Sequence, residues 1–327
     1  MISFEIKISV LGKFHFNRKL LLTTTQHHMN RLIGITLKPL ISLMALGISL
    51  TAASEPTFKI VDAPLITFPG GHNSERKADF VADCGSPLHW DGDTLYVFNS
   101  WERPWRGEGT DLLNLKRGTK TEVDADSEKL WLWLESTWKD DDGTLYGWVH
   151  NEFPNVCPSP KQTNLPADGY PVLSRIGAVK SLDNGLNWRS QGFVFDGRPN
   201  NLKCDGLGPW YAGGVGDFGV TLDREKKYFY FFFSSFAPDV AEQGLCVARM
   251  PFEDRANPVG KVMIWHEGKW DQPAVGGGKV TPFLPVVGDV HAVECFLHWG
   301  PSIHWNTYLN KYVMVVNRTK DSEWESE

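Results

Sequence analysis

The sequence has no run of basic residues. Lysine and arginine total 33 against 39 aspartates and glutamates, so the formal net charge of the 327 residues is −6 at pH 7. Nucleic-acid-binding proteins concentrate basic side chains, because phosphate contacts dominate their affinity. We therefore expect no nucleic-acid partner. Helical patterning is also nearly absent, and only residues 112–116 and 239–242 could form short helical turns.

Cysteine is scarce, and its spacing is not that of a metal site. None of the five cysteines forms a C-x-x-C pair, which argues against a structural zinc site. In an exported protein we expect one disulfide, with Cys157–Cys204 as the candidate pair. The odd count leaves at least one thiol.

Long apolar runs are missing too. Residues 40–50 (LISLMALGISL) have the length of a signal-peptide core and are too short to span a bilayer. Basic residues precede this run, and the small residues 51–53 (TAA) follow it. We interpret residues 1–53 as an over-extended start, with Met29 as the true start, plus a signal peptide. An uncleaved membrane anchor is the alternative.

A two-strand unit recurs along the remaining chain, residues 54–327. Each copy has a Gly- or Pro-containing start, an apolar strand, a polar turn and a second strand centred on a tyrosine. Short strands joined by Asp, Gly or Asn are typical of β-hairpins. The copies are residues 84–100, 130–150, 216–236 and 300–317, with tyrosines at Tyr96, Tyr146, Tyr228 and Tyr312.

The repeated hairpin predicts an all-β fold. Hairpins that recur at blade-sized intervals favour a β-propeller over a sandwich or a barrel. Residues 176–195 and 244–270 extend the second and third copies, whereas only a short polar tail follows the fourth. We therefore expect a propeller that is truncated or incomplete in its last blade. The alternative is that residues 58–68 supply strands that close the ring.

Residues 181–188 (SLDNGLNW) match the Ser-x-Asp-x-Gly-x-x-Trp pattern of an Asp box, a turn between the outer strands of a propeller blade. In such a turn we expect Asp183 to bind backbone N–H groups, Gly185 to take a positive φ, and Trp188 to be buried. The turn lies on the outer rim of a blade. Asp183 is therefore interpreted as a residue of the fold rather than of catalysis.

An acidic residue stands just before or within the start of each hairpin. The first strands of propeller blades face a common axis, so these carboxylates could converge although they are distant in sequence. Glycoside hydrolysis needs such carboxylates, one to activate water or attack the anomeric carbon and one to protonate the departing oxygen. A third can tune the pKa of the second. The four residues are Asp83, Glu135, Asp217 and Glu294.

This pattern resembles the five-bladed β-propeller glycoside hydrolases, the superfamily of families 43, 32, 68, 62 and 117. The resemblance implies that Asp83 is the general base or nucleophile. It implies that Asp217 modulates a pKa and binds a substrate hydroxyl in the transition state. Glu294-Cys295 resembles the Glu-Cys acid motif of family 32.

The chain departs from the family motifs at three positions. Cys84 and Phe218 replace the prolines of the two Asp-Pro motifs, and Trp299 stands where family 43 has the glutamate of Glu-Gly-Pro. The general acid is then expected to be Glu294, with His298 or Glu135 as alternatives. A further alternative is that the chain has lost the general acid.

Histidine and tryptophan pairs lie in or beside the expected first strands. A histidine can hydrogen-bond sugar hydroxyls while a tryptophan stacks on the ring. The candidate substrate-binding residues are His89, Trp90, Glu135, His150, His298, Trp299 and His304. No cofactor and no metal site is predicted from ligand spacing, and a structural Ca²⁺ is implied only by analogy with the family.

The leading hypothesis is an exported, secreted or periplasmic glycoside hydrolase-like protein. It would hydrolyse poly- or oligosaccharides by an inverting acid/base mechanism, as a monomer without membrane association after signal cleavage. The first alternative is a carbohydrate-binding propeller without catalysis. The second is a sialidase, which needs three arginines for its carboxylate; Arg175, Arg249 and Arg318 are the available ones.

Overall fold

The computed structural model describes residues 84–100, 104–116, 118–124, 131–157, 171–198, 201–205, 210–292 and 294–319. All of them belong to the unit Val61–Glu327. The predicted signal peptide and Asp83 lie outside the described residues. Within those residues, no helix combines the length and the hydropathy that a membrane crossing would require.

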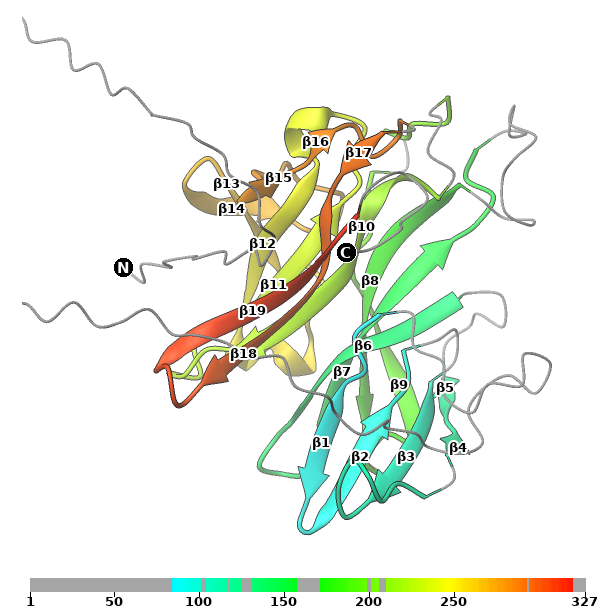
Figure 1. The fold of residues 1–327 in the computed structure, drawn as a ribbon, viewed down its shortest axis with the longest axis vertical. Helices are drawn as coiled ribbons and strands as arrows, with labels where there is room; N and C mark the ends of the chain where they lie inside the picture. The colour runs from blue at the N-terminus through cyan, green and yellow to red at the C-terminus, as the bar shows by residue number, and fades with distance from the viewer. Residues whose placement is uncertain are drawn as a thin grey trace, which may run out of the picture. The chain divides into compact units, whose positions relative to one another are not determined.

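The described residues are built from β-strands, which confirms the predicted all-β class (Figure 1). The helical elements among them are two short 3-10 helices, η1 (Val240–Glu242) and η2 (Phe252–Ala256). The first matches the helical turn expected at residues 239–242, and the Asp239 side chain caps it by accepting a hydrogen bond from the Ala241 N–H. Residues 112–116 form turns instead of a helix.

The first sheet is antiparallel and has the order β1-β2-β3-β4. Its strands are β1 (Leu88–Asp91), β2 (Thr94–Phe98), β3 (Trp105–Gly109) and β4 (Thr119–Lys120). The β1–β2 pair is the first predicted hairpin.

The second sheet has eleven strands, and its main path has the order β14-β13-β12-β11-β10-β8-β7-β6. Three further strands branch from this path, with β9 on β8, β5 on β9, and β15 on β12. The strands are β5 (Glu122–Asp124), β6 (Trp131–Lys139), β7 (Leu145–Phe153), β8 (Val172–Ser181), β9 (Asn187–Phe195), β10 (Tyr211–Leu222), β11 (Tyr228–Ser235), β12 (Gly244–Pro251), β13 (Met263–His266), β14 (Lys269–Pro273) and β15 (Leu284–Pro285).

A short parallel pairing between β8 and β10 joins the second and third hairpins into this one sheet. It links Val172 to Tyr211, and Ser174 to Gly214. Gly214 has a φ of +92°, and a Cβ built on it would lie 2.0 Å from the Ser174 carbonyl oxygen. Only glycine permits this backbone conformation and this approach.

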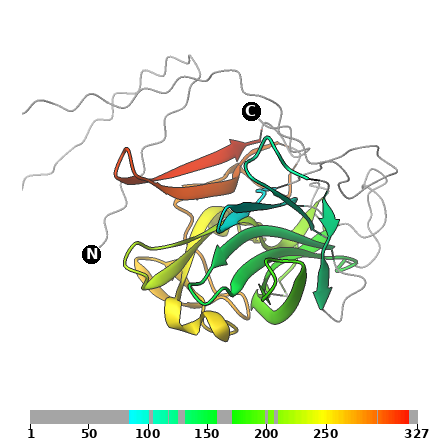
Figure 2. The same cartoon turned by 90° about the horizontal axis from the view of Figure 1, so that it is seen from below.

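The fourth hairpin consists of β18 (His298–Asn306) and β19 (Lys311–Arg318), preceded by the small β16 (Val287–Gly288) and β17 (Cys295–Phe296) pair. It lies against β10, as the orange and red strands of Figure 2 show. A Cβ on Gly219 of β10 would be 2.3 Å from the Pro301 carbonyl oxygen of β18.

All four predicted hairpins are therefore present, and each predicted tyrosine lies on the second strand of its pair. No sheet formed by the described strands closes on itself. The five-bladed ring and its incomplete last blade remain predictions.

The core centres on β11, the most apolar strand of the sequence. Phe229, Phe231 and Phe233 are fully buried on one face, and the intervening residues are nearly as well buried on the other. A strand that is covered on both faces has a continuous apolar sequence rather than an alternating one. Trp148 and Phe195 pack on the first face, with ring centroids 5.0–5.6 Å from those of the phenylalanines. This core holds β7 and β10 in fixed positions.

The expected disulfide is present. Cys157 and Cys204 are joined across Cα atoms 5.5 Å apart and close a loop that contains β8 and β9. Cys84, Cys246 and Cys295 are not disulfide-bonded.

Candidate active site

Four side chains that are distant in sequence form one group, which we call the buried cluster: Cys84, Glu135, His150 and Asp217. One polar atom from each lies within 4.8 Å of those of the others. Three of the four residues are buried, and Cys84 is partly exposed. The cluster is the place where chemistry-bearing side chains from the first three predicted hairpins meet.

Irregularities in two strands point the two carboxylates at the same place. Glu135 of β6 lies at a register shift between Leu134 and Ser136. Asp217 of β10 lies at a second shift, between Gly216 and Gly219, and has a φ of +43°. Such bulges re-aim side chains, and a positive φ is costly for a residue other than glycine. The backbone is thus strained at one of the two carboxylates of the cluster.

Both oxygens of Glu135 have polar partners. Oε1 lies 3.0 Å from His150 Nδ1, and Oε2 accepts a 2.7 Å bond from the Phe218 N–H. The Glu135 side chain is completely buried. These two contacts fix the carboxylate between β7 and β10.

Ser174 determines which nitrogen of His150 carries a hydrogen. The Ser174 hydroxyl donates to the Val215 carbonyl at 2.8 Å, so its oxygen must accept at the 2.6 Å contact with His150 Nε2. Nε2 therefore carries the hydrogen. Nδ1 points toward carboxylate oxygens of Glu135, at 3.0 Å, and of Asp217, at 3.7 Å.

The pKa values of His150 and Asp217 are shifted by each other and by burial. Burial alone lowers the pKa of His150, but the hydrogen bond and the charge of Glu135, together with the charge of Asp217, raise it above its ordinary value. Burial raises the pKa of Asp217; the His150 charge opposes this rise and the Glu135 charge adds to it. The cluster therefore favours a positive charge between the two carboxylates.

Cys84 connects the cluster to the first hairpin. Its Sγ donates to Asp217 Oδ1 at 3.3 Å. The other oxygen of this carboxylate, Oδ2, is buried and has no hydrogen-bond partner among the described residues. Asp83, the predicted base, directly precedes Cys84 in the sequence.

Three predicted site residues, Glu135, His150 and Asp217, thus come together. The histidine and tryptophan of β1 do not join them. His89 is buried and lies 3.3 Å from Asn184 Oδ1, and its ring stacks on Tyr96. Burial lowers the pKa of His89 to about 4. Trp90 is half exposed.

The predicted residues near the fourth hairpin also lie outside the cluster. Glu294 is exposed and directly precedes β17. His298 and Trp299 are half-buried at the start of β18, and His304 is exposed on the same strand. Cys84 and Ser174 were missed as site residues, because the sequence offers no spacing signal for ligands on separate strands.

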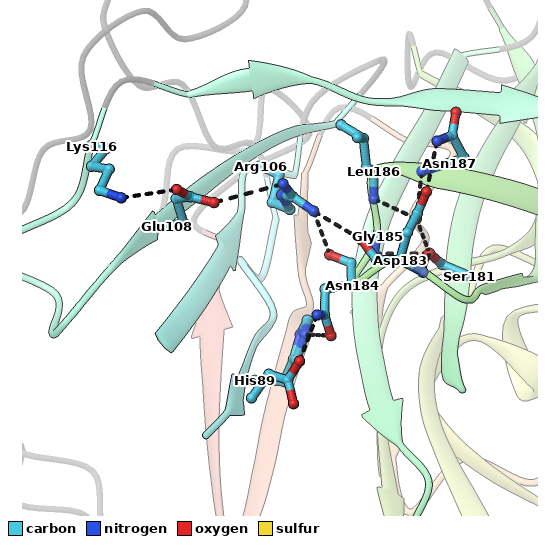
Figure 3. A network of polar contacts seen from close by, with 11 residues as sticks. His89, Arg106, Glu108, Lys116, Ser181, Asp183, Asn184, Gly185, Leu186 and Asn187 are labelled. Carbon is cyan, nitrogen blue, oxygen red and sulfur yellow. Dashed lines mark hydrogen bonds and ion pairs between the residues drawn. The ribbon is translucent and has the colours of Figure 1, made fainter. Parts of the chain in front are cut away.

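A second polar network surrounds Asp183 (Figure 3). Asp183 Oδ1 accepts bonds from the backbone N–H groups of Leu186, at 3.1 Å, and Asn187, at 2.9 Å. Gly185 has a φ of +80°, and Trp188 is 1 % exposed. These contacts make residues 181–188 a closed turn, so Asp183 acts in folding.

Arg106 attaches this turn to the first sheet. Its guanidinium donates to the Asp183 carbonyl at 3.0 Å and to the Asn184 carbonyl at 3.3 Å, as Figure 3 shows. The Asn184 amide in turn donates to Asp91.

The three arginines named for a sialidase each pack on different aromatic rings. Arg175 lies over Phe193, and its guanidinium donates to Asn151 Oδ1. Arg249 lies over Tyr228 and Trp270, and Arg318 lies over Phe296. These three arginines thus pack against separate parts of the fold.

No protein-family model and no curated protein matches this sequence. Among solved structures, an endo-arabinase from Bacteroides thetaiotaomicron aligns with 8 % identity over 80 % of this chain and 76 % of its own, with a TM-score of 0.43. An exo-β-1,3-galactanase from Phanerochaete chrysosporium aligns with 10 % identity over 80 % and 66 %, with a TM-score of 0.37.

A family 43 endo-arabinanase from Bacillus licheniformis aligns with 13 % identity over 79 % of this chain and 99 % of its own, with a TM-score of 0.30. At these scores the likeness to the solved structures is partial.

Proposed function

We propose that this protein is an exported glycoside hydrolase-like protein that cleaves glycosidic bonds of poly- or oligosaccharides. The observation that supports it is the convergence of Glu135 and Asp217 at two strand irregularities, beside the residue that follows Asp83. This convergence places Asp217, the proposed hydroxyl-binding residue, beside the segment that carries Asp83, one of the two carboxylates that acid/base hydrolysis of a glycosidic bond would use. The chain would form a five-bladed propeller.

Glu135 and Asp217 are not themselves the acid and base of an inverting reaction. Their oxygens lie within 4.8 Å of each other, whereas the carboxyl groups of inverting enzymes are about 6.5–9.5 Å apart to admit a water molecule. The Glu135 oxygens also face His150 and the Phe218 N–H rather than an open substrate position. Glu135 is therefore assigned a positioning role, because it orients His150 and the backbone of β10 at Phe218.

Asp83 is proposed as the general base and Asp217 as the residue that binds a substrate hydroxyl through Oδ2. The unpaired, buried Oδ2 suits this role, because a hydroxyl that donates to it supplies the missing partner. Glu294 is proposed as the general acid because Glu294-Cys295 resembles the Glu-Cys acid motif of family 32.

The test is release of sugars from arabinan, xylan, fructan, galactan and agar oligosaccharides by the purified protein. Asp83→Asn should abolish release, and Glu294→Gln should lower it by about 100-fold or more. Asp93→Asn, at an exposed position in the β1–β2 turn, is the matched control and should leave release unchanged. No release from any glycan by the folded protein would refute the proposal.

A carbohydrate-binding propeller without catalysis is the second candidate. Trp299 at the position of the family 43 acid is the observation that favours it. This candidate predicts retained glycan binding in both the wild type and Asp83→Asn, with no turnover in either. The sialidase alternative is not proposed, because its three arginines engage separate aromatic partners.

A further inference from the structure

The buried cluster has the donor set of a transition-metal site. It offers a thiol, an imidazole nitrogen and two carboxylates. The separations fit a common centre, with 3.3 Å from Cys84 Sγ to Asp217 Oδ1, and 3.0 and 3.7 Å from His150 Nδ1 to the two carboxylates. Ligands at about 2.0–2.3 Å from a tetrahedral metal lie at similar distances from one another.

The orientation of His150 is already that of a ligand. Because Ser174 accepts the Nε2 hydrogen, Nδ1 is the nitrogen that faces the other three donors. Metal-bound histidines almost always donate their second N–H to such a partner, which fixes the ring and its tautomer. Gly216 fixes the ring further, since a Cβ there would come within 2.4 Å of Nε2.

A positive species is needed among these groups. Two carboxylate oxygens face Nδ1 in a buried site, an arrangement that either a proton on Nδ1 or a cation bound at the centre makes favourable. A proton on Nδ1 would serve Glu135 at 3.0 Å, whereas Asp217 Oδ1 at 3.7 Å lies beyond hydrogen-bond distance of Nδ1. A metal can occupy the centre and engage the Asp217 carboxylate directly.

We propose that the buried cluster binds one zinc ion, with Cys84 as a thiolate ligand, His150 through Nδ1, and the carboxylates of Glu135 and Asp217. The combination of sulfur, nitrogen and oxygen suits Zn²⁺, which is bound tetrahedrally by these ligand types. It does not suit Ca²⁺, which takes six to eight oxygen ligands. The calcium implied by the family resemblance therefore does not fit this site.

The metal would tie the segment before β1 to β6, β7 and β10. Asp83 is adjacent to Cys84, so the ion would also fix the backbone next to the proposed base. This last consequence rests on the proposed function, whereas metal binding itself does not.

The experiment measures metal binding without any glycan. The full, untagged chain is treated with a chelator and titrated with Zn²⁺ and, separately, with Co²⁺. We expect one Zn²⁺ per chain with a Kd below about 1 µM. Co²⁺ should give the thiolate-to-cobalt charge-transfer absorption that marks a sulfur ligand.

Four variants test the ligand assignment. Cys84→Ser should remove the charge-transfer absorption, and His150→Gln should weaken Zn²⁺ binding by about 100-fold or more. Ser174→Ala keeps every ligand and should weaken binding by about 10–100-fold through the loss of the Nε2–H partner. Cys295→Ser, at another thiol that is not disulfide-bonded, is the matched control and should change neither signal.

Absence of stoichiometric Zn²⁺ binding by the folded wild type would overturn the proposal. So would binding that Cys84→Ser leaves intact with its charge-transfer absorption. Circular dichroism of each variant identifies failure to fold, and Cys84 is partly exposed, so its substitution by serine tests the ligand without a large packing change. Zinc binding without sugar release would refute the proposed hydrolysis and leave the metal site standing.

Discussion

Gly216 lies against the ring of His150 so closely that any other residue would collide with it. A Cβ on Gly216 would be 2.4 Å from both His150 Nε2 and Ser174 Oγ. The backbone of β10 thus touches the histidine whose second nitrogen faces Glu135 and Asp217. The geometry of the cluster depends on this contact as much as on hydrogen bonds.

We expect Gly216→Ala to lower the free energy of unfolding by about 2–3 kcal/mol, because the methyl group overpacks a buried polar contact. Urea unfolding measures the change. Gly85→Ala is the control, since the nearest atom to its Cβ would be the Glu135 carbonyl oxygen at 3.7 Å. Equal effects of the two substitutions would contradict the proposed collision.

Asp183→Ala should lower the free energy of unfolding by about 1–2 kcal/mol, because two backbone N–H groups lose their acceptor. It should leave sugar release and Zn²⁺ binding by the folded protein unchanged. Leu182→Ala, in the same turn but 76 % exposed, should have little effect on stability. Loss of activity by a folded Asp183→Ala protein would mean that the residue has a role beyond the turn.

The free energy of unfolding should decrease as the pH is lowered, partly because of His89. Burial lowers the pKa of His89 from 6.5 to about 4, so the folded protein keeps it neutral where the unfolded chain protonates it. Its contribution is fully present above pH 6.5 and is lost as the pH falls toward 4, an effect of about 3 kcal/mol.

The measurement is urea unfolding of the wild type and His89→Gln between pH 7 and pH 4.5. The glutamine does not titrate, so the pH dependence should be shallower in the variant. The difference between the two proteins isolates His89 from the other groups that titrate in this range. Parallel curves would show that His89 does not contribute.

The disulfide should stabilise the protein substantially. Cys157 and Cys204 are separated by 47 positions, and closing a loop of this size is worth about 4 kcal/mol in the chain-entropy model, with typical values of about 2–4. The double substitution of both cysteines by serine should lower the free energy of unfolding accordingly. Dithiothreitol should then destabilise the wild type and have little effect on the variant.

The hairpins were predictable because they are local. Asp, Gly and Asn turns between alternating strands, with Tyr96 or Tyr146 at the same place in each copy, specify pairing over short distances. The pairing of β8 with β10 was not predictable, because it depends on Gly214 approaching Ser174 from forty positions away. The sequence predicted separate blades, and this contact merges two of the hairpins into one sheet.

The site was predictable only in part for the same reason. Glu135 and Asp217 could be found because each belongs to the first strand of a hairpin. Cys84 was noticed only as a replacement for proline, and its contact with Asp217 comes from the packing of three hairpins. Ser174 carries no motif, and its role follows from one hydrogen bond to His150.

The parallel link between β8 and β10 has a consequence for how this protein can vary. Glu135 and His150 lie on one side of the link and Asp217 on the other, and the pairing between them extends only from Tyr211 to Gly214 on β10. An insertion or deletion in this segment would shift the register and turn Asp217 away from its partners. These few residues therefore align Asp217 with Glu135 and His150.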